Sequence, residues 1–267
     1  MTDRYAVIGN PISHSKSPLI HRMFAVQTGQ DISYEAIEAP LDGFRDTLVR
    51  LRQEGYKGCN VTVPFKFEAF NAATDLTDRA LAAEAVNTLS FNDGLTGGDN
   101  TDGAGLVRDI RHNLDMALEN KRVLLVGAGG AASGVVLPLL EAGAQLFIVN
   151  RTPAKACELA ARFASSAVQG GGYEAIGDAQ FDVVINATSA GLSGSAIPLP
   201  ETLFAAGALA YDMMYGRDTP FMAFARDNGA ALVADGLGML VEQAAEAFNI
   251  WRGVRPDTAE LIATLRN

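Results

Sequence analysis

The opening third of the chain alternates between two hydrophobic patterns, which predict strands and helices in turn. Apolar runs at residues 5–8 and 58–63 are typical of buried strands, and residues 33–38 alternate in polarity like a half-buried strand. Between them, residues 18–28 and 43–54 have the apolar spacing that predicts helices. This β-α-β-α-β series predicts an α/β fold, with a parallel-rich sheet covered by helices on its faces.

The second half of the chain continues this alternation and then becomes helical. Apolar runs predict five further strands. Two begin at Arg122 and Leu146, and the others cover residues 181–186, 209–213 and 231–234. From residue 238 the pattern is helical, first to residue 251 and again over residues 257–265. No strand follows to complete another crossover. We therefore expect these last helices to return and pack on the first domain.

A complete α/β unit precedes residue 120, so we expect two domains. The chain has 267 residues, 48% of them hydrophobic, which is enough to bury a sizeable core. The loop at residues 92–98 is the expected end of the first domain. The chain is then expected to cross between the domains near residues 99–102 and again near residues 235–238.

The composition argues against nucleic acid and metal as partners. The net charge is −10, and lysine and arginine are scattered rather than gathered in a basic stripe. A local pocket can still bind a small anion, because it outweighs net charge at short range. Cys59 and Cys157 form no disulfide framework, and His14, His21 and His112 lack partners at zinc-like spacing. This cysteine usage fits a reducing compartment.

The chain carries no pattern of a signal peptide or a membrane span. Its first residues lead directly into an apolar strand, so we expect a cytoplasmic protein. Residues 123–140 contain no charge, but several glycines and Pro138 make them a poor lipid-spanning helix.

The most informative motif is Gly-x-Gly-x-x-Ala at residues 127–132, between an apolar run and an Ala-rich helical segment. In a dinucleotide site Gly127 permits the tight turn, Gly129 lets the backbone approach a pyrophosphate, and Ala132 allows close helix–strand packing. The pyrophosphate would lie on free N–H groups at the helix start. The alternative is an ordinary strand-to-helix turn, since glycine-rich turns are common in α/β folds.

The residues after the next strand predict which dinucleotide binds. An NAD site usually has Asp or Glu there to bind the adenosine ribose. This chain has Asn150, Arg151 and Thr152, with Lys155 one turn on and no carboxylate. A guanidinium and a hydroxyl suit a 2′-phosphate, so the pattern predicts NADP and a hydride-transfer reaction.

Hydroxyl groups cluster after the first predicted strand. Ser17 fits a helix N-cap and Pro18 the first helical position. Ser13, Ser15 and Ser17 would then lie at the positive end of that helix, which suits a carboxylate ligand. Simple capping is the alternative, and it needs Ser17 but not Ser15.

Four further polar residues are candidates for chemistry, and each has an ordinary structural explanation. Lys66 begins a helix just past a strand, where ligands collect in open α/β sheets, but most lysines are simply solvated. Asp102 lies where the chain leaves the first domain, and it could cap a helix over residues 103–113. Asn87 could be a strand-entry residue and Gln243 a surface amide.

Taken together, these motifs resemble the shikimate dehydrogenase family from the first strand to the last helix. The resemblance covers residues 9–18, 60–66, 85–88, 98–103, 127–132, 150–152, 186–189 and 235–243. Several motifs in family order are far more specific than a single one.

The resemblance implies NADP-dependent interconversion of shikimate and 3-dehydroshikimate, a step of chorismate and aromatic amino-acid biosynthesis. Lys66 and Asp102 would handle the proton of the reacting hydroxyl, while Ser15 and Ser17 would hold the carboxylate. It also implies a substrate domain of residues 1–101 and 238–267, and a Rossmann-type NADP domain of residues 102–237. The small-molecule substrate would be bound by a monomer or a homodimer.

The remaining implied contacts fall into two sets. Thr62, Asn87, Tyr215 and Gln243 would complete the polyol site. The cofactor set is Asp78, Gly127, Ala128, Gly129, Gly130, Ala131, Asn150, Arg151, Thr152, Lys155, Thr188, Met213 and Gly236. No metal is expected.

Two other functions remain open. One is a quinate/shikimate dehydrogenase of broader specificity, often using NAD, against which Arg151 and Thr152 argue. The other is a non-catalytic NADP-binding sensor on the same fold, which could lose Lys66 or Asp102 without penalty, although both are present.

Overall fold

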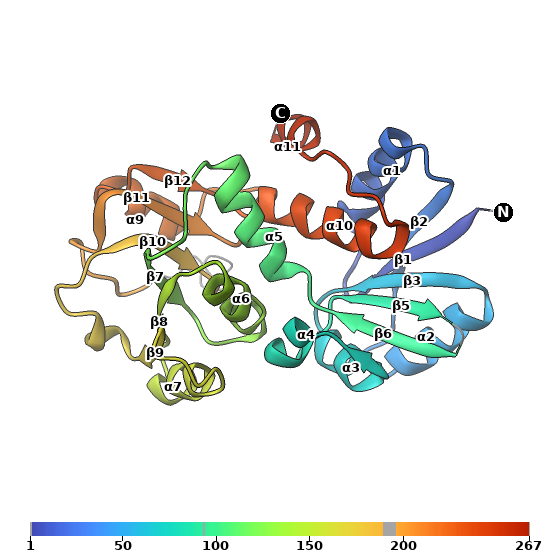
Figure 1. Ribbon diagram of the computed structural model, residues 1–267, viewed down its shortest axis with the longest axis horizontal. Coiled ribbons are helices and arrows are strands. Elements are labelled where there is room, and N and C mark those ends of the chain that lie inside the picture. Colours follow the sequence, from blue (N-terminus) through green and yellow to red (C-terminus); the bar gives the residue numbers. More distant parts are fainter. Residues whose placement is uncertain (1, 93, 189–195, 267) are drawn as a thin grey trace. The chain divides into compact units, whose positions relative to one another are not determined.

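The computed structural model describes residues 2–92, 94–188 and 196–266, and the chain divides into two compact units (Figure 1). Unit 1 comprises Met1–Gly105 and Leu240–Asn267, and unit 2 comprises Leu106–Met239. The division falls slightly later in the chain than the predicted domain boundaries at residues 101/102 and 237/238, so Asp102 lies in unit 1. No helix in the described ranges is both long and apolar enough to cross a membrane.

Unit 1 is built on a sheet whose strand order is β2-β1-β3-β5-β6-β4. β1 is parallel to both β2 and β3, whereas β5 is antiparallel to β3 and to β6. The predicted parallel pairing therefore holds for the first three strands and ends at β5, which is antiparallel to both of its neighbours, whereas β4 is parallel to β6. The strands are β1 (Asp3–Gly9), β2 (Ile32–Glu38), β3 (Tyr56–Val61), β4 (Asp75–Leu76), β5 (Thr88–Asn92) and β6 (Leu95–Asp99).

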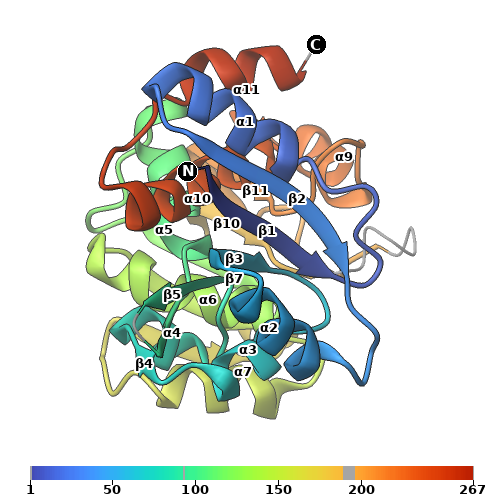
Figure 2. The same ribbon diagram turned by 90° about the vertical axis from the view of Figure 1, so that its right-hand side faces the viewer.

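Helices cover both faces of this sheet because successive side chains of a strand point to opposite faces. On β1, Ala6 and Ile8 are buried with Leu51 of α2, while Tyr5 stacks on Trp251 of α10 with ring centroids 4.6 Å apart. Figure 2 displays α2 and α3 on one side of β1–β3 and α1 on the other. The helices of unit 1 are α1 (Ser17–Thr28), α2 (Phe44–Gln53), α3 (Lys66–Ala72), α4 (Asp78–Ala83), α10 (Leu237–Arg252, whose first three residues belong to unit 2) and α11 (Ala259–Arg266).

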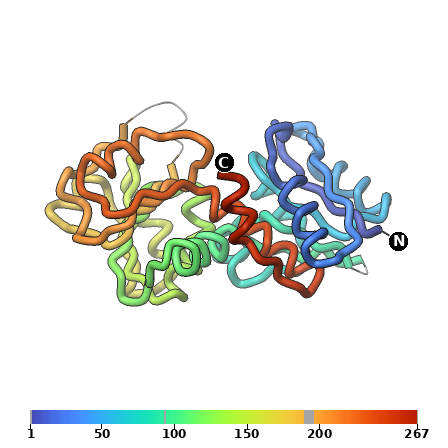
Figure 3. Tube along the Cα trace, turned by 90° about the horizontal axis from the view of Figure 1, so that it is seen from above, coloured from blue at the N-terminus to red at the C-terminus, as the bar shows by residue number. Residues whose placement is uncertain are grey.

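The last two helices return to the first unit, as predicted, and they pack there on α1. Ile20 and Phe24 of α1 share one buried cluster with Phe248 of α10 and Leu261 of α11. In Figure 3 the red C-terminal segment accordingly runs beside the blue N-terminal one. The C-terminal helices thus complete the core of unit 1.

Unit 2 contains a wholly parallel sheet in the order β12-β11-β10-β7-β8-β9. Numbered from its first strand this is the order 3-2-1-4-5-6, read from the β9 edge, which is the doubly wound arrangement of a Rossmann fold. The strands are β7 (Arg122–Val126), β8 (Gln145–Val149), β9 (Val168–Gly171), β10 (Phe181–Asn186), β11 (Phe204–Asp212) and β12 (Leu232–Ala234).

Both faces of the unit 2 sheet are buried at its centre, which explains why β7 and β8 are nearly continuous apolar runs, whereas the edge strand β9 (Val-Gln-Gly-Gly) is not. Val123 and Leu125 face the cluster that contains α6 and α7, whereas Leu124 and Val126 face the cluster that contains α9. The helical segments are α5 (Asp102–Arg108, which begins in unit 1), the π-helical turn η1 (Asp109–Asn113), α6 (Gly130–Glu141), α7 (Pro153–Ala161), the 3₁₀ turn η2 (Tyr173–Ile176) and α9 (Pro220–Asp227).

The segment at residues 92–98, predicted as the loop that ends the first domain, instead contains most of strand β6. Its glycines suggested a loop, but close packing requires at least one of them. A Cβ on Gly98 would lie 2.7 Å from Ala73 Cβ and 2.9 Å from a Leu76 methyl group. The first unit therefore continues beyond this segment.

The helix expected over residues 103–113 also differs, because it begins at Asp102 and widens into η1 at Asp109. The Asp109 carboxylate is fully buried and accepts a 2.6 Å hydrogen bond from the Tyr211 hydroxyl. Such a buried charge needs hydrogen-bond partners, and the wider turn brings them together. Apolar spacing carries no signal for this contact.

His21 of α1 is a fully buried imidazole that stacks on Tyr34, with ring centroids 4.1 Å apart and an interplanar angle of 5°. Burial lowers the pKa of His21 from 6.5 to about 3, and the Asn60 side chain opposes this shift. The folded protein therefore keeps His21 neutral at pH values where the unfolded chain would protonate it.

We expect His21 to make the protein less stable in mild acid. Because the unfolded chain binds a proton that the folded protein does not, the free energy of unfolding should fall from pH 6.5 downward, by at most about 1.4 kcal/mol per pH unit. Urea titrations between pH 5 and 7 measure this slope. His21→Phe, which keeps an aromatic ring, should flatten it, whereas His112→Asn at an exposed site should not. Equal slopes in the wild type and His21→Phe would contradict the assignment.

Candidate active site

The topology of unit 1 brings several predicted site segments to one edge of its sheet. β1 and β3 are parallel, and β6 runs the same way because β5 is antiparallel to both β3 and β6. The carboxyl ends of β1, β3 and β6 therefore lie at the same edge as the amino end of β5. The segments at this edge carry Ser15 and Ser17, Thr62 and Lys66, Asn87, and Asp102.

At this edge Lys66 and Asp102 form an ion pair, with Lys66 Nζ 2.5 Å from Asp102 Oδ2. Lys66 is the first residue of α3, and Asp102 is the first residue of α5. Their side chains are 27% and 12% exposed, so the pair is partly desolvated yet reachable. Beside such a pair, the ammonium can give a proton to a substrate oxygen and the carboxylate can take one from a substrate hydroxyl.

Two amides adjoin this pair. Asn87 Nδ2 donates to Asp102 Oδ1 at 2.8 Å, and Gln243 Oε1 of α10 lies 3.4 Å from the same nitrogen. Asn87 is 3% exposed and precedes β5, as predicted. The structure thus brings Lys66, Asn87, Asp102 and Gln243 into one polar cluster.

A bidentate ion pair holds the loop that leads to Asp102. Arg79 of α4 donates through Nε and Nη2 to the two oxygens of Asp99, at 2.6 and 2.8 Å. Burial would raise the pKa of Asp99, but the bonds from Arg79 lower it below its ordinary value. Asp99 stays ionised, and it also accepts the backbone N–H of Asn100 at 2.7 Å. This fixes the start of the turn into α5.

The expected capping role of Ser17 is wrong. The helix begins one residue earlier than predicted, so Ser17 is its first residue, and the N-cap is Lys16, which makes no side-chain capping bond. The Ser15 hydroxyl instead accepts the N–H of Ser17 at 3.2 Å, because it lies two positions before the helix start. Thr62 follows β3, and its methyl group would be 2.6 Å from a Cβ on Gly9.

The glycine loop of unit 2 has the geometry expected of a dinucleotide site. Gly127 has a φ of +115°, which side chains rarely adopt. Gly129 has φ −94° and ψ −174°, which any residue can adopt. A Cβ added to Gly129 or Gly130 would have no heavy atom of the described neighbours within 4 Å. The open space lies at the start of α6, where backbone N–H groups are free.

Four predicted cofactor residues follow the carboxyl end of β8. Asn150 Nδ2 donates to the Thr152 carbonyl at 3.0 Å, and the Lys155 N–H donates to the same carbonyl at 3.1 Å. Arg151 is exposed, yet its charge is close enough to Tyr173 to oppose the rise in that hydroxyl's pKa caused by burial. The Arg151 guanidinium is thus available to a phosphate at this edge.

A buried carboxylate joins the loops after β10 and β11. Asp212 is fully buried, and it accepts bonds from Asn186 Nδ2 at 3.1 Å and from the Met214 N–H at 3.0 Å. Asn186 Oδ1 in turn accepts both the N–H and the hydroxyl of Thr188. Two loops that carry predicted site residues are therefore fixed to each other.

Four further predicted site residues are Asp78, Met213, Tyr215 and Gly236. A Cβ on Gly236 would lie 2.2 Å from the Met213 carbonyl oxygen, so these two predicted cofactor residues touch. Tyr215 is half-buried in unit 2, and burial raises the pKa of its hydroxyl. Asp78 is an exposed first residue of α4 in unit 1.

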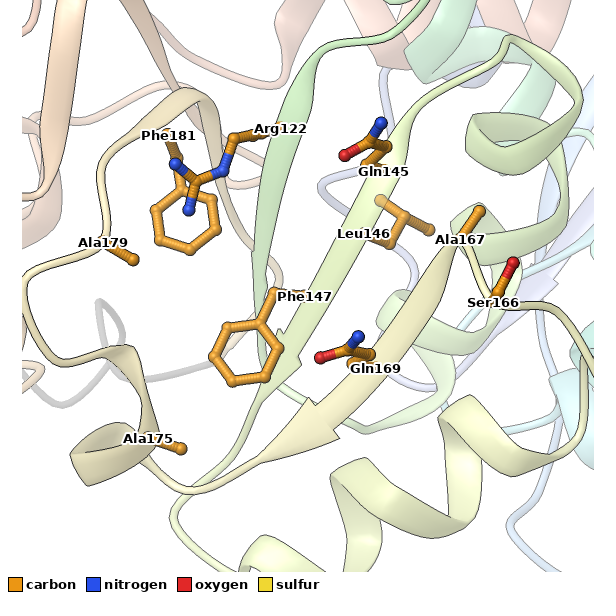
Figure 4. A pocket seen from close by; sticks show the side chains of 10 residues that line it. All are labelled: Arg122, Gln145, Leu146, Phe147, Ser166, Ala167, Gln169, Ala175, Ala179 and Phe181. Atoms are coloured by element: carbon orange, nitrogen blue, oxygen red, sulfur yellow. The ribbon is translucent and has the colours of Figure 1, made fainter.

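A cavity of about 530 Å³ on the unit 2 sheet contains none of the predicted site residues (Figure 4). Its walls include Arg122 and Gln145, the first residues of β7 and β8, with the Arg122 guanidinium 5.2 Å from the centre of the Phe181 ring. It therefore reaches the end of the sheet opposite the glycine loop.

Comparison with known proteins identifies the family. Three family models match in chain order: the shikimate dehydrogenase substrate binding domain at residues 7–89, shikimate / quinate 5-dehydrogenase at 109–193, and the shikimate 5'-dehydrogenase C-terminal domain at 236–266. A shikimate dehydrogenase (NADP(+)) from Methylobacillus flagellatus is 62% identical over 267 residues, covering 99% of each chain. The chain belongs to the shikimate dehydrogenase family. The resemblance inferred from the motifs is confirmed.

Solved structures of similar proteins agree with this two-unit α/β fold. An Ael1 enzyme from Pseudomonas putida has a TM-score of 0.96 and 51% identity, covering 99% of this chain and 98% of its own. The shikimate 5-dehydrogenase of Thermus thermophilus, solved in complex with NADP(H) and shikimate, has a TM-score of 0.88 and 34% identity, covering 99% of each chain. The predicted fold class is confirmed.

Several buried polar residues near the candidate active site and the candidate cofactor site were not predicted from the sequence. Asn60, Thr88 and Thr101 join the Asn87 cluster through hydrogen bonds. Asn60 lay inside a recognised motif, and Asp212 ends a buried strand. A polar side chain at the end of an apolar run was the signal for Asp212, and a polar side chain inside a buried strand was the signal for Asn60.

We expect Gly129→Ala to separate binding from folding. Its backbone angles suit alanine and its surroundings are open, so the free energy of unfolding without ligand should change by less than about 1 kcal/mol. The methyl group would obstruct a pyrophosphate at the start of α6, so the Kd for NADP⁺ should rise about tenfold or more. Thermal melts and fluorescence titration measure the two effects.

Gly170→Ala is the matched control. Its Cβ would lie 2.3 Å from the Ala156 carbonyl oxygen, so this variant should lose stability by about 1–3 kcal/mol. If Gly129→Ala binds NADP⁺ as well as the wild type, the pyrophosphate does not lie at this loop.

Proposed function

We propose that this chain is an NADP-dependent shikimate dehydrogenase that interconverts shikimate and 3-dehydroshikimate. The observation that carries the proposal is the partly buried Lys66–Asp102 pair, 2.5 Å apart, with Asn87 and Gln243 beside it. Oxidation of a secondary alcohol releases a hydride and a proton, so it needs a hydride acceptor and a positioned base. NADP⁺, when bound at the glycine loop, would be the hydride acceptor.

We assign the proton to Lys66 and Asp102 jointly. Lys66 Nζ and Asp102 Oδ2 share one short bond, so a substrate hydroxyl near both can pass its proton into the pair. Asp102 is held by Asn87 on its other oxygen, which keeps the carboxylate oriented. Asn87, Gln243, Thr62 and Tyr215 would bind the other hydroxyls of the substrate.

The substrate carboxylate is assigned to Ser15 and Ser17. Both residues lie at the start of α1, a twelve-residue helix whose first N–H groups favour a negative charge. Ser15 is partly exposed, and its hydroxyl already accepts the N–H of Ser17. It can therefore donate its own proton to a carboxylate oxygen.

The cofactor assignment is supported by the chain's own residues. The open space over Gly129 and Gly130 fits a pyrophosphate, and the exposed Arg151 fits a 2′-phosphate. Ala128, Ala131, Asn150, Thr152 and Lys155 would line the same path. Thr188, Met213, Gly236 and Asp78 would lie toward the nicotinamide.

A broader quinate/shikimate dehydrogenase is the alternative function, and one matching family model bears both substrate names. The exposed Arg151 without a neighbouring carboxylate favours NADP over NAD. Assays of quinate with NAD⁺ and of shikimate with NADP⁺ separate the two. A non-catalytic sensor would bind NADP⁺ without turnover in the same assays.

We also propose that the protein acts in the cytoplasm, as a monomer or a homodimer and without nucleic acid. Cys59 is buried and Cys157 exposed, and both are free thiols, which suits a reducing compartment. Sedimentation of the purified protein measures its oligomeric state.

Removing Lys66 should slow the reaction without preventing cofactor binding. General acid–base groups contribute about 10²–10⁴ in rate, so Lys66→Ala should lower kcat on that scale. Lys57→Ala, at an exposed lysine on β3, is the matched control and should keep kcat near the wild-type value. The Kd for NADP⁺ should stay within about twofold in both variants.

Asp102→Ala should also lower kcat and raise the KM for shikimate. The double variant should lose less than the product of the single losses, because the two residues act as a unit. Near-normal kcat in Lys66→Ala would contradict its role, and fully multiplicative losses would contradict joint action.

Arg151→Ala should erode the preference for NADP⁺. Hydrogen bonds to charged groups contribute about 1.5–3 kcal/mol, so the KM for NADP⁺ should rise about tenfold or more. NAD⁺ lacks the 2′-phosphate and serves as the control, because its KM should barely change in the same variant. Equal use of both cofactors by the unmodified enzyme would refute the assignment.

A further inference from the structure

A chain of buried polar groups extends from Asp102 to strand β2 within unit 1. Its inner members Asn60, Thr88 and Asn87 are 7%, 1% and 3% exposed. The bonds run from Tyr34 Oη to Asn60 Oδ1 (2.7 Å), from Asn60 Nδ2 to Thr88 Oγ1 (3.0 Å), from Thr88 Oγ1 to Asn87 Oδ1 (2.8 Å), and from Asn87 Nδ2 to Asp102 Oδ1 (2.8 Å).

Backbone groups fix the direction of both amides in this chain. Asn60 Nδ2 lies 3.1 Å from the Asn87 carbonyl, which can only accept, so this atom must be the NH₂ group. Asn87 Oδ1 lies 2.9 Å from the Thr101 N–H, which can only donate, so this atom must be the carbonyl oxygen. These backbone partners therefore identify the oxygen and the NH₂ group of each amide.

Two hydroxyls link these amides. Thr88 Oγ1 accepts the Asn60 NH₂ and donates to Asn87 Oδ1, which can only accept, and this 2.8 Å bond is shorter than the 3.4 Å contact of Thr88 Oγ1 with Thr101 Oγ1. The Tyr34 hydroxyl donates to Asn60 Oδ1, and burial raises the pKa of Tyr34 well above its ordinary value, with a bond to Ser17 opposing this. Tyr34 therefore remains a donor throughout the pH range of an assay.

The result is an amide of Asn87 that presents its NH₂ group, and only that group, to the candidate active site. Its two N–H bonds face Asp102 and the oxygens of Thr101 and Gln243. If the amide turned over, its carbonyl would face the Asp102 carboxylate and repel it. The orientation of Asn87 thus decides whether Asp102 is held or expelled.

We propose that Tyr34 and Thr88 are positioning residues that fix the Asn87 amide, and through it the Asp102 carboxylate, for the shikimate hydroxyls. This inference rests on the proposed function. Neither residue touches the Lys66–Asp102 pair directly; each acts through the next hydrogen bond in the chain. Tyr34 lies on β2 and Thr88 on β5, so strands on both sides of β1 and β3 contribute to the orientation of one side chain.

Thr88→Val tests the proposal, because valine keeps the shape of threonine and removes the hydroxyl. Loss of a neutral hydrogen bond at a substrate-orienting amide should raise the KM for shikimate roughly three- to tenfold. The KM for NADP⁺ should stay within about twofold. Thr88→Ser, which restores the hydroxyl, should return the KM for shikimate to near the wild-type value.

Tyr34→Phe removes one oxygen and keeps the ring that stacks on His21. It should raise the KM for shikimate by less than Thr88→Val does, since the Thr101 N–H still holds Asn87 Oδ1. Tyr56→Phe is the matched control, because the Tyr56 hydroxyl accepts a hydrogen bond from Arg4 and is not part of the chain that leads to Asn87. The Tyr34→Phe/Thr88→Val double variant should lose less than the product of the single losses, because both act on one chain.

A purely structural role would give a different result. Partial unfolding lowers the amount of active enzyme, and so lowers the apparent kcat with no change in either KM. A lower kcat with unchanged KM values in Thr88→Val would overturn the proposal. So would wild-type kinetics in Thr88→Val, or a Thr88→Ser variant that does not recover the wild-type KM for shikimate. A wild-type enzyme that does not oxidise shikimate would instead contradict the proposed function itself.

Discussion

The partial burial of the Asp102 carboxylate is the constraint on which the candidate active site depends. A carboxylate withdrawn from water must be paired and hydrogen-bonded, and here an ammonium holds one oxygen and an amide the other. Those partners come from the start of α3 and from the residue before β5. Each of these elements is placed by the strand pairing of the sheet. The geometry of the site is thus a consequence of topology rather than of any single loop.

Much of the fold follows from periodicity. The central strands of unit 2, such as β7 and β8, are buried on both faces, so their sequences are nearly continuous apolar runs that are easy to recognise. The edge strand β9 (Val-Gln-Gly-Gly) has no such run and was not predicted. Gly127 was assigned to a tight turn, and its positive φ agrees. Lys66 was expected at a helix start and Asn87 ahead of a strand, and both lie there. These features are local, and local chemistry determines them.

What the sequence could not predict depends on contacts between distant segments. Gly98 belongs to a strand because Ala73 and Leu76 leave no room for a Cβ, which composition cannot reveal. Asp109 enters a π-helical turn, and the hydroxyl it accepts belongs to Tyr211, 102 positions away. Arg79 and Asp99, like Asn60 and Thr88, are ordinary residues when considered singly. Folding brings the two members of each pair within hydrogen-bond distance, and their sequence positions do not reveal this.

The packing of α1 against α10 and α11 has a consequence for synthesis. Gln27 and Asp257 are joined by hydrogen bonds across 230 positions, so the core of unit 1 needs both ends of the chain. A ribosome releases the N-terminal segment first, and unit 2 has all its strands before α11 exists. Until α10 and α11 have been made, Ile20 and Phe24 lack most of the apolar partners that bury them. On a nascent chain, this face of α1 is the surface that a chaperone would meet.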